Sequence, residues 1–169
     1  MRAPTVADAD DLGRVHVRAW QTAYRGGLMP DAYLDSLSND ERATMWREAL
    51  EQGPGARSSR LVADVDGTVV GFAIVGPAGG DPESPVGELY AINVDPDHWA
   101  TGVGSDLLAA AMVELAAATF SSVFLWVHPD NIRARRFYES RGWSDDGLDR
   151  RQDVLGVEVP EVRYSRPLS

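Results

Sequence analysis

Residues 131–143 read NIRARRFYESRGW and directly follow the apolar segment VFLWVH, residues 123–128. The continuous apolar character of residues 123–128 predicts a strand at the centre of a sheet, covered on both faces. Residues 131–140 are predicted to form a helix, which ends at Gly142. A buried strand followed at once by a helix indicates a sheet with helices packed on it.

A second strand and helix lie upstream and enclose two glycines. Residues 88–94 read ELYAINV and predict a strand, and apolar residues at helical spacing over 103–115 predict an amphipathic helix. Gly102 and Gly104 lie where this helix begins. Backbone N–H groups in the first turn of a helix lack partners inside it, and with the helix dipole they form an anion site. The glycines leave room for a group such as pyrophosphate.

Two glycines also fit a tight connection between a strand and a helix, so alone they are a weak signal. The dinucleotide-binding fingerprint needs a third glycine three residues after the second, and Leu107 stands there. The sequence therefore argues against a dinucleotide fold of that type.

The rest of the chain completes an α/β pattern. Asp66-Gly67 and Leu155-Gly156 are expected to turn two hairpins, and Ser38 is expected to cap a helix. The further helices are expected at 7–24, 30–37 and 38–51, and the further strands at 60–65, 68–75, 150–154 and 157–164.

Charge and composition limit the partners. The net charge is −10 and the pI about 4.6, so the surface repels nucleic acid and anionic lipid, and neither is expected as a partner. The same charge attracts cations weakly.

Cysteine is absent, and the start of the chain does not resemble a signal peptide, which together favour a cytoplasmic protein. His16, His98 and His128 lie far apart in sequence without metal-ligand spacing, so no metal is expected.

The glycine turn, paired with the downstream motif Asn-x-x-Ala-x-x-Phe-Tyr-x-x-x-Gly-Trp at 131–143, resembles the GNAT superfamily of N-acetyltransferases. The resemblance covers about the last two-thirds of the chain. The chain length and the absence of a linker predict one domain over residues 1–169. The resemblance implies a mixed, mainly antiparallel sheet with a splayed central strand pair and helices on both faces. It also implies acetyl-CoA as cosubstrate and direct transfer of the acetyl group to a primary amine.

The resemblance further implies where the cosubstrate binds. The pantetheine arm would lie between strands 88–94 and 123–128, and the turn from Ala100 to Ser105 would hold the pyrophosphate. The family commonly has Gln or Arg where this chain has Trp99; Arg133 is the nearest residue to compensate, although it could equally lie on a solvated helix face. The expected cofactor-binding residues are Ile92, Asn93, Val94, Ala100, Thr101, Gly102, Val103, Gly104, Ser105, Asn131, Arg133, Ala134 and Phe137.

Tyr138 and Glu88 are the candidate catalytic residues. Tyr138 matches the family tyrosine beside the thioester sulfur and could protonate the leaving thiolate, or it could be a core aromatic next to Phe137. Glu88 matches a carboxylate that deprotonates the amine directly or through water, or it is an ordinary strand-end residue. His128 is a second candidate base.

Trp20 and Tyr24 are the candidate acceptor-binding residues. They lie four apart on one helical face and could line a pocket or simply pack in the core. Residues 26–30 form a candidate lid. Trp126 stands where some relatives that acetylate peptide N-termini carry a carboxylate, which favours a small-molecule amine. Acetylation of a protein lysine or N-terminus, a non-catalytic acyl-CoA-binding module and a homodimer stay open alternatives.

Overall fold

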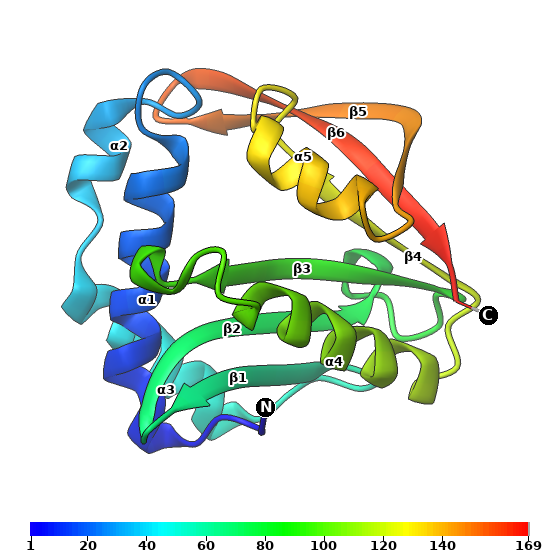
Figure 1. Ribbon diagram of the computed structural model, residues 1–169, viewed down its shortest axis with the longest axis horizontal. Coiled ribbons are helices and arrows are strands. Elements are labelled where there is room, and N and C mark those ends of the chain that lie inside the picture. Colours follow the sequence, from blue (N-terminus) through cyan, green and yellow to red (C-terminus); the bar gives the residue numbers. More distant parts are fainter. Residues whose placement is uncertain (169) are drawn as a thin grey trace.

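The computed structural model describes residues 1–168, whose six strands form one sheet in the order β1-β2-β3-β4-β6-β5 (Figure 1). Of the neighbouring pairs, β3 and β4 are parallel and the others antiparallel. None of the helices described there is long and apolar enough to cross a bilayer. The strands are β1 (Ser59–Val65), β2 (Thr68–Pro77), β3 (Val86–Val94), β4 (Ser122–Val127), β5 (Ser144–Val154) and β6 (Val157–Pro167).

Five α-helices and three short 3-10 turns connect the strands (Figure 1). The α-helices are α1 (Ala9–Tyr24), α2 (Asp31–Ser36), α3 (Asn39–Gln52), α4 (Val103–Ala117) and α5 (Ile132–Glu139). The 3-10 turns are η1 (Val6–Asp8), η2 (Ala78–Gly80) and η3 (Pro96–His98).

The two predicted hairpins form, because their turn residues adopt left-handed backbone conformations. Asp66 and Gly67 have φ of 52° and 83°, and Leu155 and Gly156 have φ of 51° and 78°. A two-residue turn with positive φ at both positions matches the twist of the strands that it joins. The predicted cap at Ser38 is also confirmed, since its hydroxyl accepts the N–H of Glu41 at 3.3 Å.

Helices α1 and α3 cover one face of the β1–β3 half of the sheet. Leu12 and Val15 of α1 are fully buried there, and Trp46 of α3 meets Phe72 of β2 edge-on with ring centroids 4.8 Å apart. Helix α4 covers the opposite face, where Leu107 is fully buried in a second apolar cluster that also contains residues of β4, β6 and α5. The prediction of helices on both faces is therefore confirmed.

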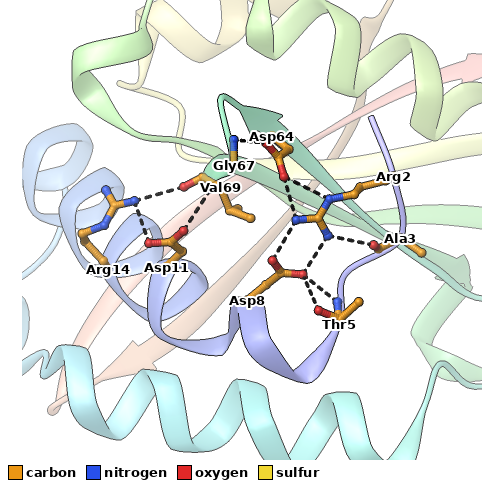
Figure 2. Close-up of polar contacts among 9 residues, drawn as sticks. All are labelled: Arg2, Ala3, Thr5, Asp8, Asp11, Arg14, Asp64, Gly67 and Val69. Carbon is orange, nitrogen blue, oxygen red and sulfur yellow. Dashed lines mark hydrogen bonds and ion pairs between the residues drawn. The ribbon is translucent and has the colours of Figure 1, made fainter.

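An arginine near the N-terminus joins the start of the chain to β1. The guanidinium of Arg2 lies 2.8 Å from carboxylate oxygens of both Asp8 and Asp64 (Figure 2). The backbones of Arg2 and Val62 also exchange two hydrogen bonds, at 3.1 and 2.9 Å. These contacts fix the entry into α1.

The centre of the sheet is split, as the resemblance implied. Strands β3 and β4 pair over Val86–Glu88 and 122–124, and beyond these residues they have no ladder with each other. A shift in register opposite Ile74 and Val75 leaves Tyr90 as an extra residue in β3, which bends the strand. The two halves of the sheet form a V that opens toward α1 (Figure 1).

The predicted strand at 150–154 was too short. Strand β5 begins at Ser144 and pairs with β6 around a register shift between Asp145 and Asp149. Almost all of β5 is exposed on both faces, so no alternation of apolar and polar residues marks its first half.

Candidate active site

A cavity of about 630 Å³ occupies the gap between β3 and β4. Five segments line it: the last turns of α1, the end of β3, the turn that leads into α4, the end of β4, and α5 with the residues that flank it. The predicted site residues that line it are Tyr24, Ile92, Asn93, Val94, Ala100, Gly102, Gly104, Ser105, Asn131, Arg133, Ala134, Phe137 and Tyr138.

Three other predicted binding residues do not line the cavity. The hydroxyl of Thr101 donates to the carbonyl of His98 at 2.7 Å, and Val103 packs against the core beneath α4. The ring of Trp20 lies between those of Tyr24 and Tyr33, with centroids 5.3 and 6.2 Å away. Trp20 can therefore support Tyr24, but it is not itself part of the cavity wall.

The cavity reaches an uncapped helix end. Gly102 precedes α4 with φ of 98°, and no side chain among residues 1–168 caps the helix there. Gly104 and Ser105, in the first turn, line the cavity, so their backbone N–H groups are placed to bind an anion. The preceding turn is held by Trp99, whose indole N–H donates to the carbonyl of Val94 at 2.8 Å.

Three arginines surround this end of the cavity: Arg133, Arg136 and Arg141. Arg133 stacks on Trp99, with its guanidinium carbon 3.5 Å from the ring centroid, and burial lowers its pKa. Arg141 lies over the ring of Phe137 at 4.0 Å and donates to the hydroxyl of Ser105. Within the described part of the chain none of the three forms an ion pair, so in an acidic protein their charge remains available for an anionic ligand.

Sequence reasoning missed Arg136 and Arg141. The signal was present, because four of the sixteen basic residues fall between positions 133 and 141 of a chain with net charge −10. Arg136 also lies three residues after Arg133, on the same side of a helix.

The β3 edge supplies backbone groups to the middle of the cavity. Beyond Glu88 this edge has no ladder with β4, and Ile92, Asn93 and Val94 line the gap. An unpaired strand edge can exchange hydrogen bonds with an extended molecule that carries amide groups.

Tyr138 lies deep in the cavity and is 8% exposed. Its ring packs against Phe137 and Trp143 at centroid distances of 5.3 and 5.9 Å. Burial, and secondarily Tyr24, raise the pKa of the Tyr138 phenol well above its usual range. At neutral pH this side chain can donate a proton, and it is unsuited to accept one.

Neither candidate base lines this cavity. Glu88 lies in the paired part of β3, where its carboxylate accepts the N–H of Gly79 at 2.9 Å. Proton transfer to Glu88 would therefore require an intervening water. His128 is buried and accepts the N–H of Asp130 at Nδ1, 3.1 Å away, so its neutral ring carries the proton on Nε2. Burial lowers the pKa of His128, which keeps the ring neutral.

The end of the cavity away from α4 is mainly apolar. Ala19, Ala23 and Tyr24 form one wall and Trp126 the other. Burial, with the nearby carboxylate of Glu161, raises the pKa of Tyr24 to about 12, so this phenol also stays protonated. A second cavity, of about 370 Å³, lies between the predicted lid loop and the start of β6.

The central strands of the sheet part at this cavity, as the resemblance to acetyltransferases implied, and a cationic helix end lies at one side of it. The family model described as Acetyltransferase (GNAT) family matches residues 18–143. The chain belongs to this family.

The comparisons with individual proteins agree. The chain is 31% identical over 169 residues to the "Uncharacterized N-acetyltransferase YuaI" of Bacillus subtilis (strain 168), covering 99% of this chain and 92% of that protein. It is 33% identical over 145 residues to a mycothiol acetyltransferase of Clavibacter sepedonicus, covering 86% of this chain and 42% of the relative, so it spans less than half of that protein. Among solved structures, PaiA N-acetyltransferase from Thermoplasma acidophilum, in complex with coenzyme A, has a TM-score of 0.72 at 19% identity over 98% of this chain and 96% of its own, which shows the shared fold.

Proposed function

We propose that the protein transfers the acetyl group of acetyl-CoA to the nitrogen of a small primary amine. The observation that carries this proposal is the continuous cavity between β3 and β4, which has a cationic end and an apolar end. Each end of the cavity suits one of the two substrates. Tyr138 lines the same cavity as both ends.

The cationic end suits coenzyme A. Its diphosphate fits the uncapped start of α4, where N–H groups of the first turn face the cavity and the N-terminal dipole favours negative charge. Arg133, Arg136 and Arg141 supply the charge that phosphate recognition needs. The amide-bearing arm fits the free edge of β3 at Ile92 and Asn93. When bound, acetyl-CoA supplies an acetyl group already activated as a thioester.

Tyr138 then acts on the leaving group. Because its pKa is raised by burial, the phenol holds its proton throughout the working pH range and can give it to a departing thiolate. The chain has no cysteine, which suits direct transfer without an acyl-cysteine intermediate. The attacking amine must be neutral. The proton that its ammonium form loses beforehand can leave through water toward Glu88.

The apolar end limits the acceptor. Tyr24 offers an aromatic face that holds an ammonium group by about 0.5–2 kcal/mol, enough to orient an amine before it loses its proton. The ring of Trp126 already carries a cation of the chain itself, because the guanidinium carbon of Arg150 lies 4.4 Å from its centroid. The acidic surface raises the local concentration of cations. Several relatives are named for the small molecule mycothiol, which supports a small-molecule acceptor over a protein.

A panel assay tests the proposal. CoA release from acetyl-CoA is measured with polyamines, aminoglycosides, amino acids, and histone-like and N-terminal peptides at equal concentration. The chain contains no lysine, so acetylation of its own lysines cannot add to the signal. Turnover of at least one small amine is expected. Efficient acetylation of peptides with no small amine turned over would overturn the acceptor class but keep the acetyltransferase activity.

A further inference from the structure

A buried ion cluster lies outside the cavity, centred on Asp95 directly after β3. Asp95 is 1% exposed, and its Oδ2 accepts hydrogen bonds from Arg14 at 2.6 Å and Arg18 at 3.0 Å. Its Oδ1 accepts the N–H of Asp97 at 3.1 Å, which caps η3. Asp95 therefore joins helix α1 to the first residues of the turn that leads to α4.

Both arginines make a second contact. Arg14 donates to the carbonyl of Val69 at 3.0 Å and pairs with Asp11, whose carboxylate accepts the N–H of Val69 (Figure 2). Arg18 reaches the carboxylate of Asp97 at 3.0 Å. One face of α1 is thus attached to the start of β2, the end of β3 and η3 by charged groups, which form stronger and more directional hydrogen bonds than neutral ones.

The cluster connects the two ends of the cavity. In α1, the acceptor wall consists of Ala19, which is the last fully buried residue of the helix, and of Ala23 and Tyr24, which are partly exposed. On the other side, η3 leads directly into Trp99 and the uncapped start of α4. Arg18 lies beside Ala19 and one turn before Ala23, so the cluster attaches α1 just before this wall leaves the core.

We propose that Asp95, with Arg14 and Arg18, is a positioning residue that fixes the distance between the acceptor wall on α1 and the cofactor turn before α4. The proposal rests on the proposed function of the cavity. Transfer between two bound molecules depends steeply on their separation, and a misplacement of about 1 Å can cost about 100-fold in rate. The cluster would hold that separation without touching either substrate.

The test compares two arginines whose ion pairs both involve helix α1. Arg18→Gln removes a side chain that is 40% exposed and pairs with Asp97 at 3.0 Å. The matched control, Arg47→Gln, removes one that is 43% exposed and pairs with Asp10 at 3.1 Å, away from the cavity. Both variants lose an exposed arginine–aspartate pair, but Arg18→Gln alone weakens the Asp95 cluster.

Arg18→Gln is expected to lower kcat by about 10- to 100-fold while the KM for acetyl-CoA changes little. Arg18→Lys should restore a large part of this loss, and Arg47→Gln should keep the wild-type kcat. The thermal midpoints of Arg18→Gln and Arg47→Gln should agree within a few degrees. A wild-type kcat in Arg18→Gln, or an equal loss in Arg47→Gln, would overturn the proposal.

Hydrogen exchange separates this proposal from the proposed function, because it needs no turnover. If the wild-type protein releases no CoA with any amine, the proposed function fails, and the cluster is judged by exchange alone. Arg18→Gln should then speed amide exchange in residues 19–24 and 97–102 together, relative to Arg47→Gln. Unchanged exchange in either segment would contradict a link between them. Asp95→Asn, which keeps the shape of the side chain, should reproduce the effect.

Discussion

A substitution at Gly104 can test whether the start of α4 binds the cosubstrate without disturbing the fold. A methyl group built on Gly104 would lie 3.6 Å from Phe137 and 3.8 Å from Val94, which are ordinary contact distances. The backbone there is helical, without a positive φ. Gly104→Ala should therefore fold normally, and the loss of chain entropy in the unfolded state should stabilise it by about 0.5–1 kcal/mol.

The same methyl group should obstruct the cosubstrate. A phosphate must approach the backbone N–H groups to about 2.9 Å, and displacing it weakens charge-assisted hydrogen bonds of about 1.5–3 kcal/mol each. We expect Gly104→Ala to weaken CoA binding at least about 10-fold in titration calorimetry, while the thermal midpoint rises by about 1–4 °C. The bulkier Gly104→Val should weaken binding further. Wild-type affinity in both variants would refute the assignment of the phosphate site.

Three further predictions concern catalysis and stability. Tyr138→Phe should keep CoA affinity but lower kcat by about 10²–10⁴-fold in a CoA-release assay where chemistry is rate-limiting; an unchanged kcat would remove the phenol from the reaction. Ala100 has φ of 60°, so Ala100→Gly should raise the free energy of unfolding by up to about 1 kcal/mol in urea titrations; a lower free energy of unfolding would show that this turn carries no strain. Arg2 lowers the pKa of Asp8 to about 2, below its ordinary 3.8, so their contact stabilises the fold above about pH 4 and is lost as pH falls toward 2. Arg2→Gln should lower the free energy of unfolding by about 1 kcal/mol at pH 6 and by less at pH 2, a small value because the guanidinium is half-exposed. An equal loss at both pH values would exclude this linkage.

The hairpins and helices of the fold were predictable where local chemistry determines them. Asp66-Gly67 specifies its turn by backbone preference alone, and Ser38 caps α3 through a bond three residues away. The first half of β5 was not predictable, because it is exposed on both faces and is held by pairing with β6. Pairing between distant strands leaves no periodic signal when neither face is buried.

The site divides in the same way. Gly102 and Gly104 mark a helix start, and the residues around them are enough to indicate an anion site. The placement of Glu88 and Trp20 outside the cavity could not be deduced, because it depends on where β3 leaves β4 and on how α1 packs against α2. The cluster at Asp95 joins residues about eighty positions apart and has no sequence signature.

An isotope-labelled acetyl group distinguishes direct transfer to the amine from transfer through the protein. The protein is mixed with acetyl-CoA labelled in the acetyl group and with the best amine of the panel, and both protein and amine are followed by mass spectrometry. Direct transfer predicts that label appears on the amine nitrogen in step with CoA release, while the mass of the intact protein stays constant at every time point. Label that accumulates on the protein before it reaches the amine, or CoA release without a labelled amine, would contradict direct acetyl transfer in this cavity.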